Sequence, residues 1–150
     1  MREILFRGQT RRYGEKVRAG DGAKLPSRWV YGGVLQGTGA HSIIYGGENM
    51  NDPGEGLDKW PVYTDTLGQY TGLTDKNGKR IFEGDIVKFS RFNALGYATR
   101  RVGDVRYYDE LPVFYIMATT GDAWDWCDCE DIEVIGNIHD NPELLEEEPT

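Results

Sequence analysis

Four polar side chains lie close together in the sequence and suggest acid–base chemistry. They are Gln69, Asp75, Glu83 and Asp85. Neighbouring carboxylates can serve as a general acid and a general base when their surroundings separate their pKa values. However, Asp75 and Asp85 stand in glycine-containing turn sequences, where aspartate side chains commonly bond turn amides. We therefore predict that these residues are structural, that the chain has no catalytic residues, and that it is not an enzyme.

The two cysteines are the candidate ligands for a metal ion. Cys127 and Cys129 would face the same way in a strand and present two thiolates to one ion. A zinc site needs three or four ligands, and the two histidines, His41 and His139, stand in separate segments. Acidic neighbours would also raise the thiol pKa values and oppose thiolate formation. We predict no metal site and no cofactor.

Three other ligand patterns are incomplete. The acidic run 125–131 lacks the ligand spacing and central glycine of a calcium loop. The Gly-Thr-Gly sequence at 37–39 lacks the lysine and the strand-to-helix context of a phosphate-binding loop. Nucleophilic catalysis needs a serine or cysteine beside a histidine base, and no nucleophile elbow is present. We expect turn glycines and a solvated acidic rim instead.

Arginines and aromatic residues alternate between positions 89 and 108. The candidate nucleic-acid contacts are Arg91, Phe92, Arg100 and Arg101. Aromatic rings on a β surface can stack on bases, and arginines can contact phosphates. The other interpretation is that the aromatic residues form cross-strand pairs with arginines stacked on the rings. The net charge of −8 favours this second interpretation, because it opposes attraction of a polyanion.

The stretch 67–89 predicts a hairpin, a second turn and a strand. Asn77-Gly78 favours a two-residue type I′ turn with positive φ at both positions. The sequence Glu83-Gly84-Asp85 predicts the second turn, and the run 86–89 is typical of a strand. The motif at the centre of the chain is therefore explained by backbone geometry.

Short runs of β-branched and aromatic residues predict the other strands. The expected strands cover residues 4–6, 29–35, 42–45, 60–63, 97–108, 113–118, 124–127 and 132–135, with a short extended piece at 16–18 and an exposed loop at 48–59. Gly32-Gly33 should divide 29–35 by a turn or bulge. The apolar run 113–118 should be a central strand buried on both faces. Asn141 is a good N-cap for one short C-terminal helix.

These elements predict a mainly β (β-rich α+β) fold of short antiparallel strands. A chain of 150 residues is long enough for a core of its own, so we expect a single domain over 1–150. The turn-separated strands from Asp85 to Ile135 could close into an SH3-like small barrel. Cys127 and Cys129 are two residues apart, and the small strained loop makes a poor structural disulfide, so nothing requires an oxidising compartment.

Charge is distributed unevenly along the chain. Residues 1–24 hold seven Lys or Arg and three acids, whereas residues 122–150 hold eleven acids and no Lys or Arg. Blocks of opposite sign can attract each other within a chain or between subunits. The start of the chain lacks a signal-peptide core, and no stretch approaches the ~20 apolar residues of a membrane span. We expect a soluble cytoplasmic protein without a membrane partner.

Motifs near both ends and in the middle of the chain occur together in one protein family. They lie at about residues 1–7, 66–89 and 133–145 and include Gln69-Tyr70-Thr71-Gly72, Phe82-Glu83-Gly84-Asp85 and Gly136-Asn137-Ile138. With these motifs the chain resembles the YopX family, whose members are encoded mainly by bacteriophages and prophages. The motif residues of unknown role are Gln69, Tyr70, Thr71, Gly72, Asp75, Asn77, Gly78, Glu83, Gly84 and Asp85.

The resemblance implies a phage or prophage protein in a bacterial host cell that associates with itself, and it implies no reaction. Together with the absence of a catalytic pattern, this favours a non-catalytic, self-assembling accessory module. Its partners would be copies of itself and a host or phage protein. The alternative is a nucleic-acid-binding β domain using residues 89–108. An enzyme acting on nucleotides or nucleic acids is the third interpretation.

Overall fold

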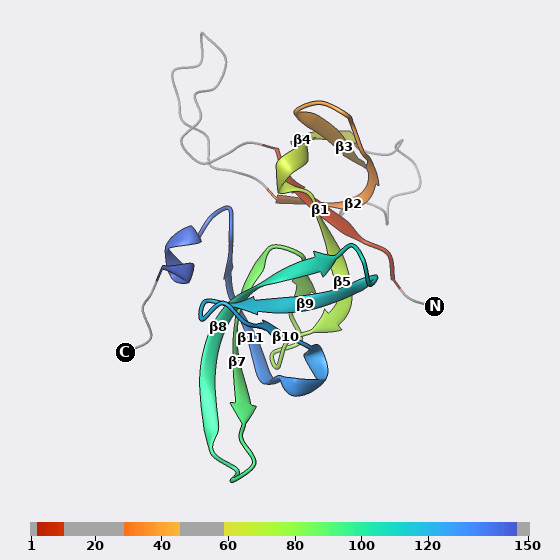
Figure 1. The fold of residues 1–150 in the computed structure, drawn as a ribbon. Coiled ribbons are helices and arrows are strands. Elements are labelled where there is room, and N and C mark those ends of the chain that lie inside the picture. The colour runs from red at the N-terminus through yellow and green to blue at the C-terminus, as the bar shows by residue number, and fades with distance from the viewer. Residues whose placement is uncertain (1–2, 11–28, 46–58, 147–150) are drawn as a thin grey trace. The chain divides into compact units, whose positions relative to one another are not determined.

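A computed structural model describes residues 3–10, 29–45 and 59–146 (Figure 1). They belong to two compact units, Met1–Tyr70 and Thr71–Thr150. Antiparallel strands dominate the described residues, which contain only short 3-10 helices, so the predicted mainly β fold is confirmed. Whether the two units fold as one domain stays a prediction. The expected extended piece at 16–18 and most of the loop at 48–59 lie outside the described residues.

The first unit contains a sheet with the order β4-β3-β2-β1-β5. Its elements are β1 (Phe6–Gln9), β2 (Trp29–Leu35), β3 (His41–Tyr45), β4 (Lys59–Tyr63), the 3-10 helix η2 (Thr64–Thr66) and the start of β5 (Gly68–Thr74). Val30, Ile44 and Val62 form the centre of its core. The first strand begins two residues later than the sequence predicts, because Phe6 is the first residue that pairs with β2.

Strand β2 corrects the prediction of two pieces separated by a turn or bulge. It is continuous, but its hydrogen-bonding partner changes at the two glycines. Residues 29–32 pair with β1, and residues 33–35 pair with β3. At Gly33 an added Cβ would lie 2.8 Å from the Tyr45 ring. This glycine therefore serves close packing between strands.

The second unit contains a five-stranded sheet with the order β10-β9-β8-β7-β11, and β6 lies beside β5. Its elements are β6 (Arg80–Phe82), β7 (Asp85–Phe92), β8 (Ala98–Tyr108), β9 (Val113–Ala118), β10 (Ala123–Trp124), the 3-10 helix η3 (Trp126–Asp128), β11 (Glu130–Asn137) and the 3-10 helix η4 (Pro142–Leu145). The recorded pairings give an open order, so closure into an SH3-like barrel stays a prediction.

One hydrophobic core lies in the second unit. Its buried members are Ile81, Val87, Phe89, Val105, Ile116, Ala118 and Cys129. In β9 only Ile116 and Ala118 are buried, so the prediction that this strand is buried on both faces is wrong. The strand lies next to the two-residue strand β10, and Val113 stays exposed at its beginning.

Strand β8 changes partners and direction at Gly103. Its first part pairs with β7 and its second part with β9, and Gly103 pairs with both. Figure 1 shows β8 rising from the β7 hairpin and then turning to run beside β9. A Cβ at Gly103 would lie 2.5 Å from the Met117 carbonyl oxygen, so the close approach requires glycine. The two ends of β8 therefore point into different parts of the surface.

Three hairpins of the second unit close with the same turn. The turns are the five-residue segments Asp75–Lys79, Asn93–Tyr97 and Ala118–Asp122. In each, the amide of the fourth residue donates to the carbonyl of the first, and the amide of the first residue donates to the carbonyl of the fifth. The fourth residue is a glycine with φ of 80°, 82° or 93°. This geometry is a type I turn followed by a left-handed residue. It corrects the predicted type I′ turn, because Asn77 does not have positive φ.

The C-terminal helix is short, as predicted, and is of the 3-10 type. Asn141 occupies the N-cap position, as predicted, but its side chain makes no capping hydrogen bond. Its Oδ1 instead accepts from the Asn137 amide at 3.3 Å. No helix in the described ranges has the length and apolar character needed to cross a membrane.

Candidate functional site

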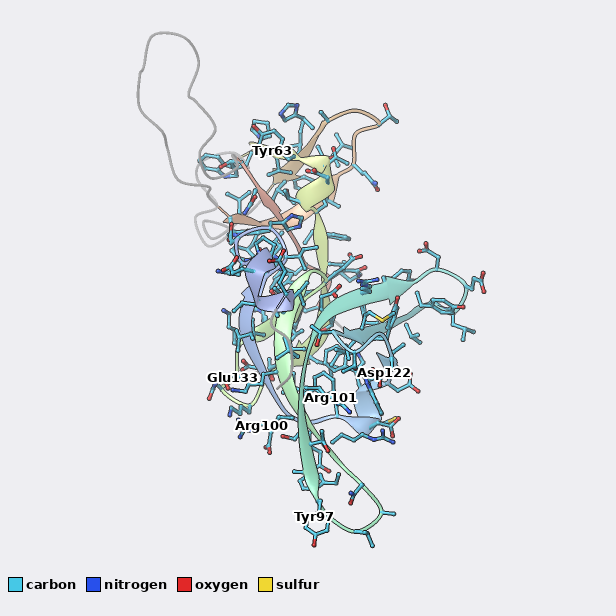
Figure 2. The ribbon with its side chains drawn as sticks, turned by 60° about the vertical axis from the view of Figure 1, so that its left-hand side comes forward. Tyr63, Tyr97, Arg100, Arg101, Asp122 and Glu133 are labelled. Atoms are coloured by element: carbon cyan, nitrogen blue, oxygen red, sulfur yellow. The ribbon has the colours of Figure 1, made fainter. Side chains whose placement is uncertain are left out.

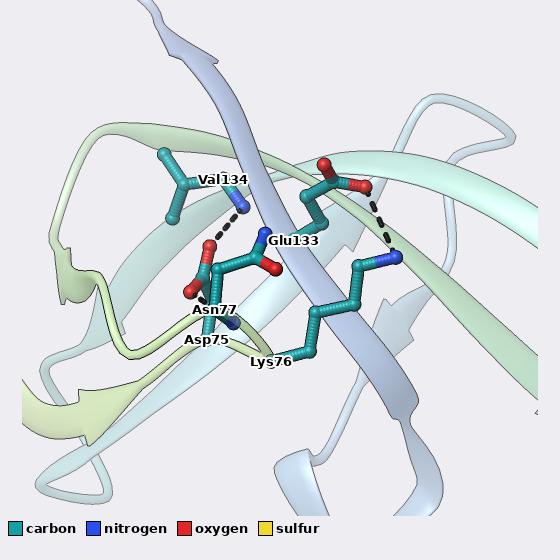
Figure 3. Close-up of polar contacts among 5 residues, drawn as sticks. All are labelled: Asp75, Lys76, Asn77, Glu133 and Val134. Atoms are coloured by element: carbon teal, nitrogen blue, oxygen red, sulfur yellow. Dashed lines mark hydrogen bonds and ion pairs between the residues drawn. The ribbon is translucent and has the colours of Figure 1, made fainter.

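The first candidate site is the turn at Asp75, whose carboxylate is almost fully buried. Its Oδ1 accepts from the amides of Asn77 and Lys79, both at 2.9 Å, and its Oδ2 accepts from the Val134 amide at 3.0 Å (Figure 3). Burial raises the pKa of Asp75, but the three backbone donors outweigh burial and hold the pKa below its ordinary value. The carboxylate is an ionised structural acceptor.

The same turn covers the outer edge of β11. This strand has β7 on one side only in the sheet. On its other side, the Lys76 amide donates to the Ile132 carbonyl at 2.8 Å, and Val134 donates to Asp75. Lys76 Nζ also lies 3.3 Å from the Glu133 carboxylate (Figure 3). An exposed strand edge invites pairing with another chain, and the turn occupies part of this edge.

The second turn of the motif is tied to the same sheet. Asp85 Oδ2 accepts from the Phe82 amide at 2.7 Å, and Gly84 has a φ of 90°. The Gly84 amide donates to the Val105 carbonyl, and its carbonyl accepts from the Ile138 amide, both at 2.9 Å. Asp85 is 1% exposed. Its surroundings are those of a turn-forming side chain.

The remaining motif residues also serve backbone geometry. Gln69 pairs with Phe6 of β1, and the amide of buried Tyr70 donates to the Leu5 carbonyl at 2.8 Å. The Thr71 hydroxyl donates to the Ile81 carbonyl at 2.8 Å. Gly72 has a φ of 88°. The structure thus gives the motif strand pairing and turn formation, and Glu83 occupies a half-buried position in the second turn.

The cysteine pair does not face one ligand. Cys127 is exposed in η3, whereas Cys129 is buried, so the sequence expectation of two thiols on one strand face is wrong. The Cys129 thiol donates to the Asp125 carbonyl at 3.3 Å. Burial, followed by its acidic neighbours, raises the pKa of Cys129 to about 11. Within the described part of the chain, no group of three His, Cys, Asp or Glu could hold a metal ion.

The predicted nucleic-acid contacts lie in the β7–β8 hairpin but on two different faces. Arg101 is opposite Phe89 in the register, which places Arg101 and Arg91 on one face and Phe92 and Arg100 on the other. Figure 2 shows Arg100 and Arg101 on opposite sides of β8. The four residues therefore do not form one continuous surface.

The Arg91–Arg101 face is partly occupied by the protein itself. The Arg91 guanidinium lies 4.1 Å from the centre of the Trp124 ring, as in the predicted stacking of arginines on aromatic rings. The Thr120 hydroxyl donates to Asp122, and this bond, with the charge of Arg101, holds the pKa of Asp122 below its ordinary value. The Arg91 guanidinium is thus already stacked within the protein, and the negative charge of Asp122 offsets part of the positive charge of Arg101.

The hairpin end beyond this face is exposed throughout residues 91–100. Its large apolar side chains are Phe92, Leu95 and Tyr97, which are 45%, 82% and 70% exposed. The interleaved aromatic residues of the sequence interpretation include Phe92 and Tyr97, whereas Leu95 was missed. The sequence signal for this exposed surface was the presence of apolar residues next to Asn93 and Gly96, which are typical of turns.

The opposite end of β8 carries a second exposed surface, of which the sequence interpretation included residues 106–108 but not Leu111 and Val113. Residues 106–113 are exposed, and their large apolar members are Tyr107, Tyr108, Leu111 and Val113. The Tyr107 ring lies edge-on to Phe114, and the Tyr108 hydroxyl donates to Glu110 at 3.1 Å. We name these two surfaces the hairpin end (residues 91–100) and the β8–β9 end (residues 106–113).

Comparisons with known proteins give the family. The crystal structure of protein EF1440 from Enterococcus faecalis is similar at 29% sequence identity, covering 70% of this chain and 74% of that chain, with a TM-score of 0.37. The search of curated proteins finds no match. A family model described as YopX protein matches residues 27–146. Because this match spans most of the sequence, as the motifs predicted, the chain belongs to the YopX family.

Proposed function

We propose that this chain is a non-catalytic protein-interaction module that assembles with copies of itself. It would serve as an accessory protein of a phage or prophage in the cytoplasm of a bacterial host. The observation that carries the proposal is the hairpin end, a projecting ribbon with three large exposed apolar side chains. Because Asn93 pairs with Tyr97, Phe92 and Tyr97 lie on opposite faces of the ribbon, and exposed apolar side chains around such a tip commonly mark contact sites for other proteins.

The hairpin end has features of a contact element. Phe92 and Tyr97 offer large contact area at a low cost in side-chain entropy. A two-stranded ribbon gains little stability from its own end, so apolar residues there contribute little to the fold. The β7–β8 segment between Asp85 and Asp104 also has four cations and no acid. These properties favour a partner with apolar and acidic groups.

The buried polar groups of the motif support a non-catalytic role. The Asp75 carboxylate accepts from three backbone amides, and Asp85 accepts from Phe82. A general base must be able to reach a substrate proton, and both carboxylates are instead buried against their own backbone. The chemistry of these residues is accounted for by the fold.

Light scattering after size-exclusion chromatography tests the self-assembly. We expect the wild type to have a mass above that of the monomer, and the triple variant Phe92→Ser, Leu95→Ser, Tyr97→Ser to be monomeric. Leu35→Ser is the matched control, because Leu35 is 64% exposed in the first unit, and it should assemble like the wild type. A wild type that stays monomeric over the accessible concentration range would refute self-assembly.

Nucleic-acid binding remains the second candidate, supported by the acid-free segment 86–103. Its surface would be the face with Phe92 and Arg100, where a base can stack and a phosphate can be contacted. Polarisation titration with a fluorescent single strand should then give affinity that falls steeply with salt. Arg100→Ala should weaken binding, whereas Arg91→Ala, which removes an arginine stacked on Trp124, is the matched control.

A further inference from the structure

The two exposed ends of β8 differ in charge. Residues 86–103, which include the hairpin end, hold Lys88, Arg91, Arg100 and Arg101 and no acid. Arg100 is exposed and forms no ion pair with another residue in the described ranges. Within the hairpin end itself the cations are Arg91, which stacks on Trp124, and Arg100, so this end is apolar at its tip and positive where its two strands begin.

The β8–β9 end is apolar and negative. Its one cation, Arg106, is bound to Asp104, with Nε 2.7 Å from Oδ2. The hydrogen bond to Asp104 is the main reason that the pKa of Arg106 is raised. Because this pair is neutral as a unit, Asp109 and Glu110 give the tip a net negative charge beside Leu111 and Val113.

We propose that the hairpin end of one copy docks on the β8–β9 end of a second copy. This contact rests on the proposed self-assembly and names the surfaces that make it. Each end presents exposed apolar side chains, and the charges around them have opposite sign. Complementary charges guide association and fix orientation, while buried apolar groups supply affinity.

The hairpin end of one copy cannot contact the β8–β9 end of the same copy. Strand β8 has 11 residues, so at ~3.3 Å per residue its path is on the order of 30 Å long, and Figure 1 shows its two ends at different parts of the second unit. Because each copy offers two different surfaces, the contact is heterologous unless two copies pair both surfaces reciprocally in a two-fold dimer. Heterologous contacts give closed rings when the rotation between copies closes, and open filaments when it does not. The change of direction of β8 at Gly103 favours a rotation between successive copies.

Mixing two variants tests the contact directly. The hairpin variant is Phe92→Ser, Leu95→Ser, Tyr97→Ser, and the β8–β9 variant is Leu111→Ser, Val113→Ser. Each variant has lost one surface and retains the other, so each alone should be monomeric. An equimolar mixture should form a 1:1 heterodimer and nothing larger, because only one intact contact can form. Light scattering measures the masses, and circular dichroism confirms that each variant is folded.

Charge reversal provides a second, independent test. Arg100→Glu alone and Asp109→Arg alone should each weaken association by about tenfold, because like charges then meet across the contact. The double variant should recover most of that loss, since the signs are again opposite. High salt should reduce the effect of both single changes. A double variant as weak as the sum of both single changes would refute this pairing.

The outcomes separate this contact from the proposed function. A monomeric wild type refutes self-assembly and the contact together. A β8–β9 variant that assembles like the wild type refutes the contact and leaves self-assembly standing. If the β8–β9 variant alone forms dimers and the hairpin variant alone is monomeric, the hairpin ends pack on each other and the proposed contact is wrong.

Discussion

The turns at Asp75–Lys79 and Asn93–Tyr97 have the same backbone bonds and opposite surroundings. In both, the first side chain accepts from the third and fifth amides at 2.9–3.0 Å. The second oxygen of Asp75 also accepts from Val134, whereas Asn93 is at the exposed tip of the β7–β8 hairpin. One turn is built into the sheet edge, and the other presents the hairpin end to solvent.

This difference shows that the same turn geometry can serve either to attach a turn to a sheet edge or to expose a hairpin end. All three turns of this type have a left-handed glycine at the fourth position, and the Asp75 and Asn93 turns add a side-chain acceptor at the first, which Ala118 lacks. A carboxylate there has a second oxygen for a distant amide, whereas an asparagine has an NH₂ group that cannot accept. The following predictions compare the two turns, from the largest expected effect to the smallest.

Replacing the first side chain should affect the two turns unequally. Asp75→Ala leaves three amides without their acceptor in a buried setting, and should lower the free energy of unfolding by about 3 kcal/mol. Asn93→Ala should lower it by less than about 1 kcal/mol, because water can bond the exposed amides. Urea denaturation measures both values. Equal losses would contradict the distinction between a buried and an exposed turn.

Acid should weaken only the Asp75 turn. The folded-state pKa of Asp75 lies below its ordinary value of 3.8, so folding releases protons between those two values. The contribution of this carboxylate to stability is therefore complete above pH 3.8 and is lost as the pH falls through the folded pKa. The difference in unfolding free energy between wild type and Asp75→Ala should shrink over this window. Urea unfolding at a series of acidic pH values checks it, with Asn93→Ala as the pH-independent control.

The fourth-position glycines should behave alike. Gly78 and Gly96 have φ of 80° and 82°, and an added Cβ would have open space at both. Alanine at either position should therefore cost about 1 kcal/mol through backbone strain alone. Thermal denaturation of the two variants tests this equality. A much larger loss at Gly78 would mean that the turn moves and breaks the Asp75–Val134 bond.

The Lys76–Glu133 ion pair should contribute least. Its side chains are 43% and 37% exposed, so solvent and salt screen the attraction. Lys76→Ala should lower the free energy of unfolding by no more than about 0.5 kcal/mol, and less in high salt. The Lys76 amide bond to Ile132 is retained in this variant, which makes it a control for Asp75→Ala. If Lys76→Ala lowered the free energy of unfolding as much as Asp75→Ala, the ion pair rather than the Asp75 carboxylate would hold the turn on the edge of β11.

The sequence predicted local features better than contacts between distant segments. The β7 strand and the turn at Glu83-Gly84-Asp85 follow from residue types. The Asn77-Gly78 pattern indicated a type I′ turn, but the Asp75 side chain bonds two turn amides and stabilises the other geometry. Its bond to Val134 spans 59 residues, and no local pattern reports such a contact.

The candidate binding residues show a similar limit. Their types indicated a contact surface around Arg91, Phe92 and Arg100, and the structure does expose that hairpin end. The alternation of side chains along paired strands divides the arginines between two faces, which requires the register with β8. In the β8–β9 end Leu111 and Val113 were missed, because Val113 begins an apolar run that is typical of a buried strand and Leu111 stands in the turn sequence before it.

The bond between Asp75 and Val134 has a consequence for the order of folding. Closing a loop of 59 residues costs chain entropy, whereas the β5–β6 hairpin needs only neighbouring residues. The hairpin can therefore form early, and the Asp75 carboxylate accepts from the Val134 amide only after β11 has packed against the turn. Loss of this bond should accelerate unfolding and leave the folding rate nearly unchanged. In a chevron plot, Asp75→Asn would then move mainly the unfolding limb, marking the attachment of β11 as a late event.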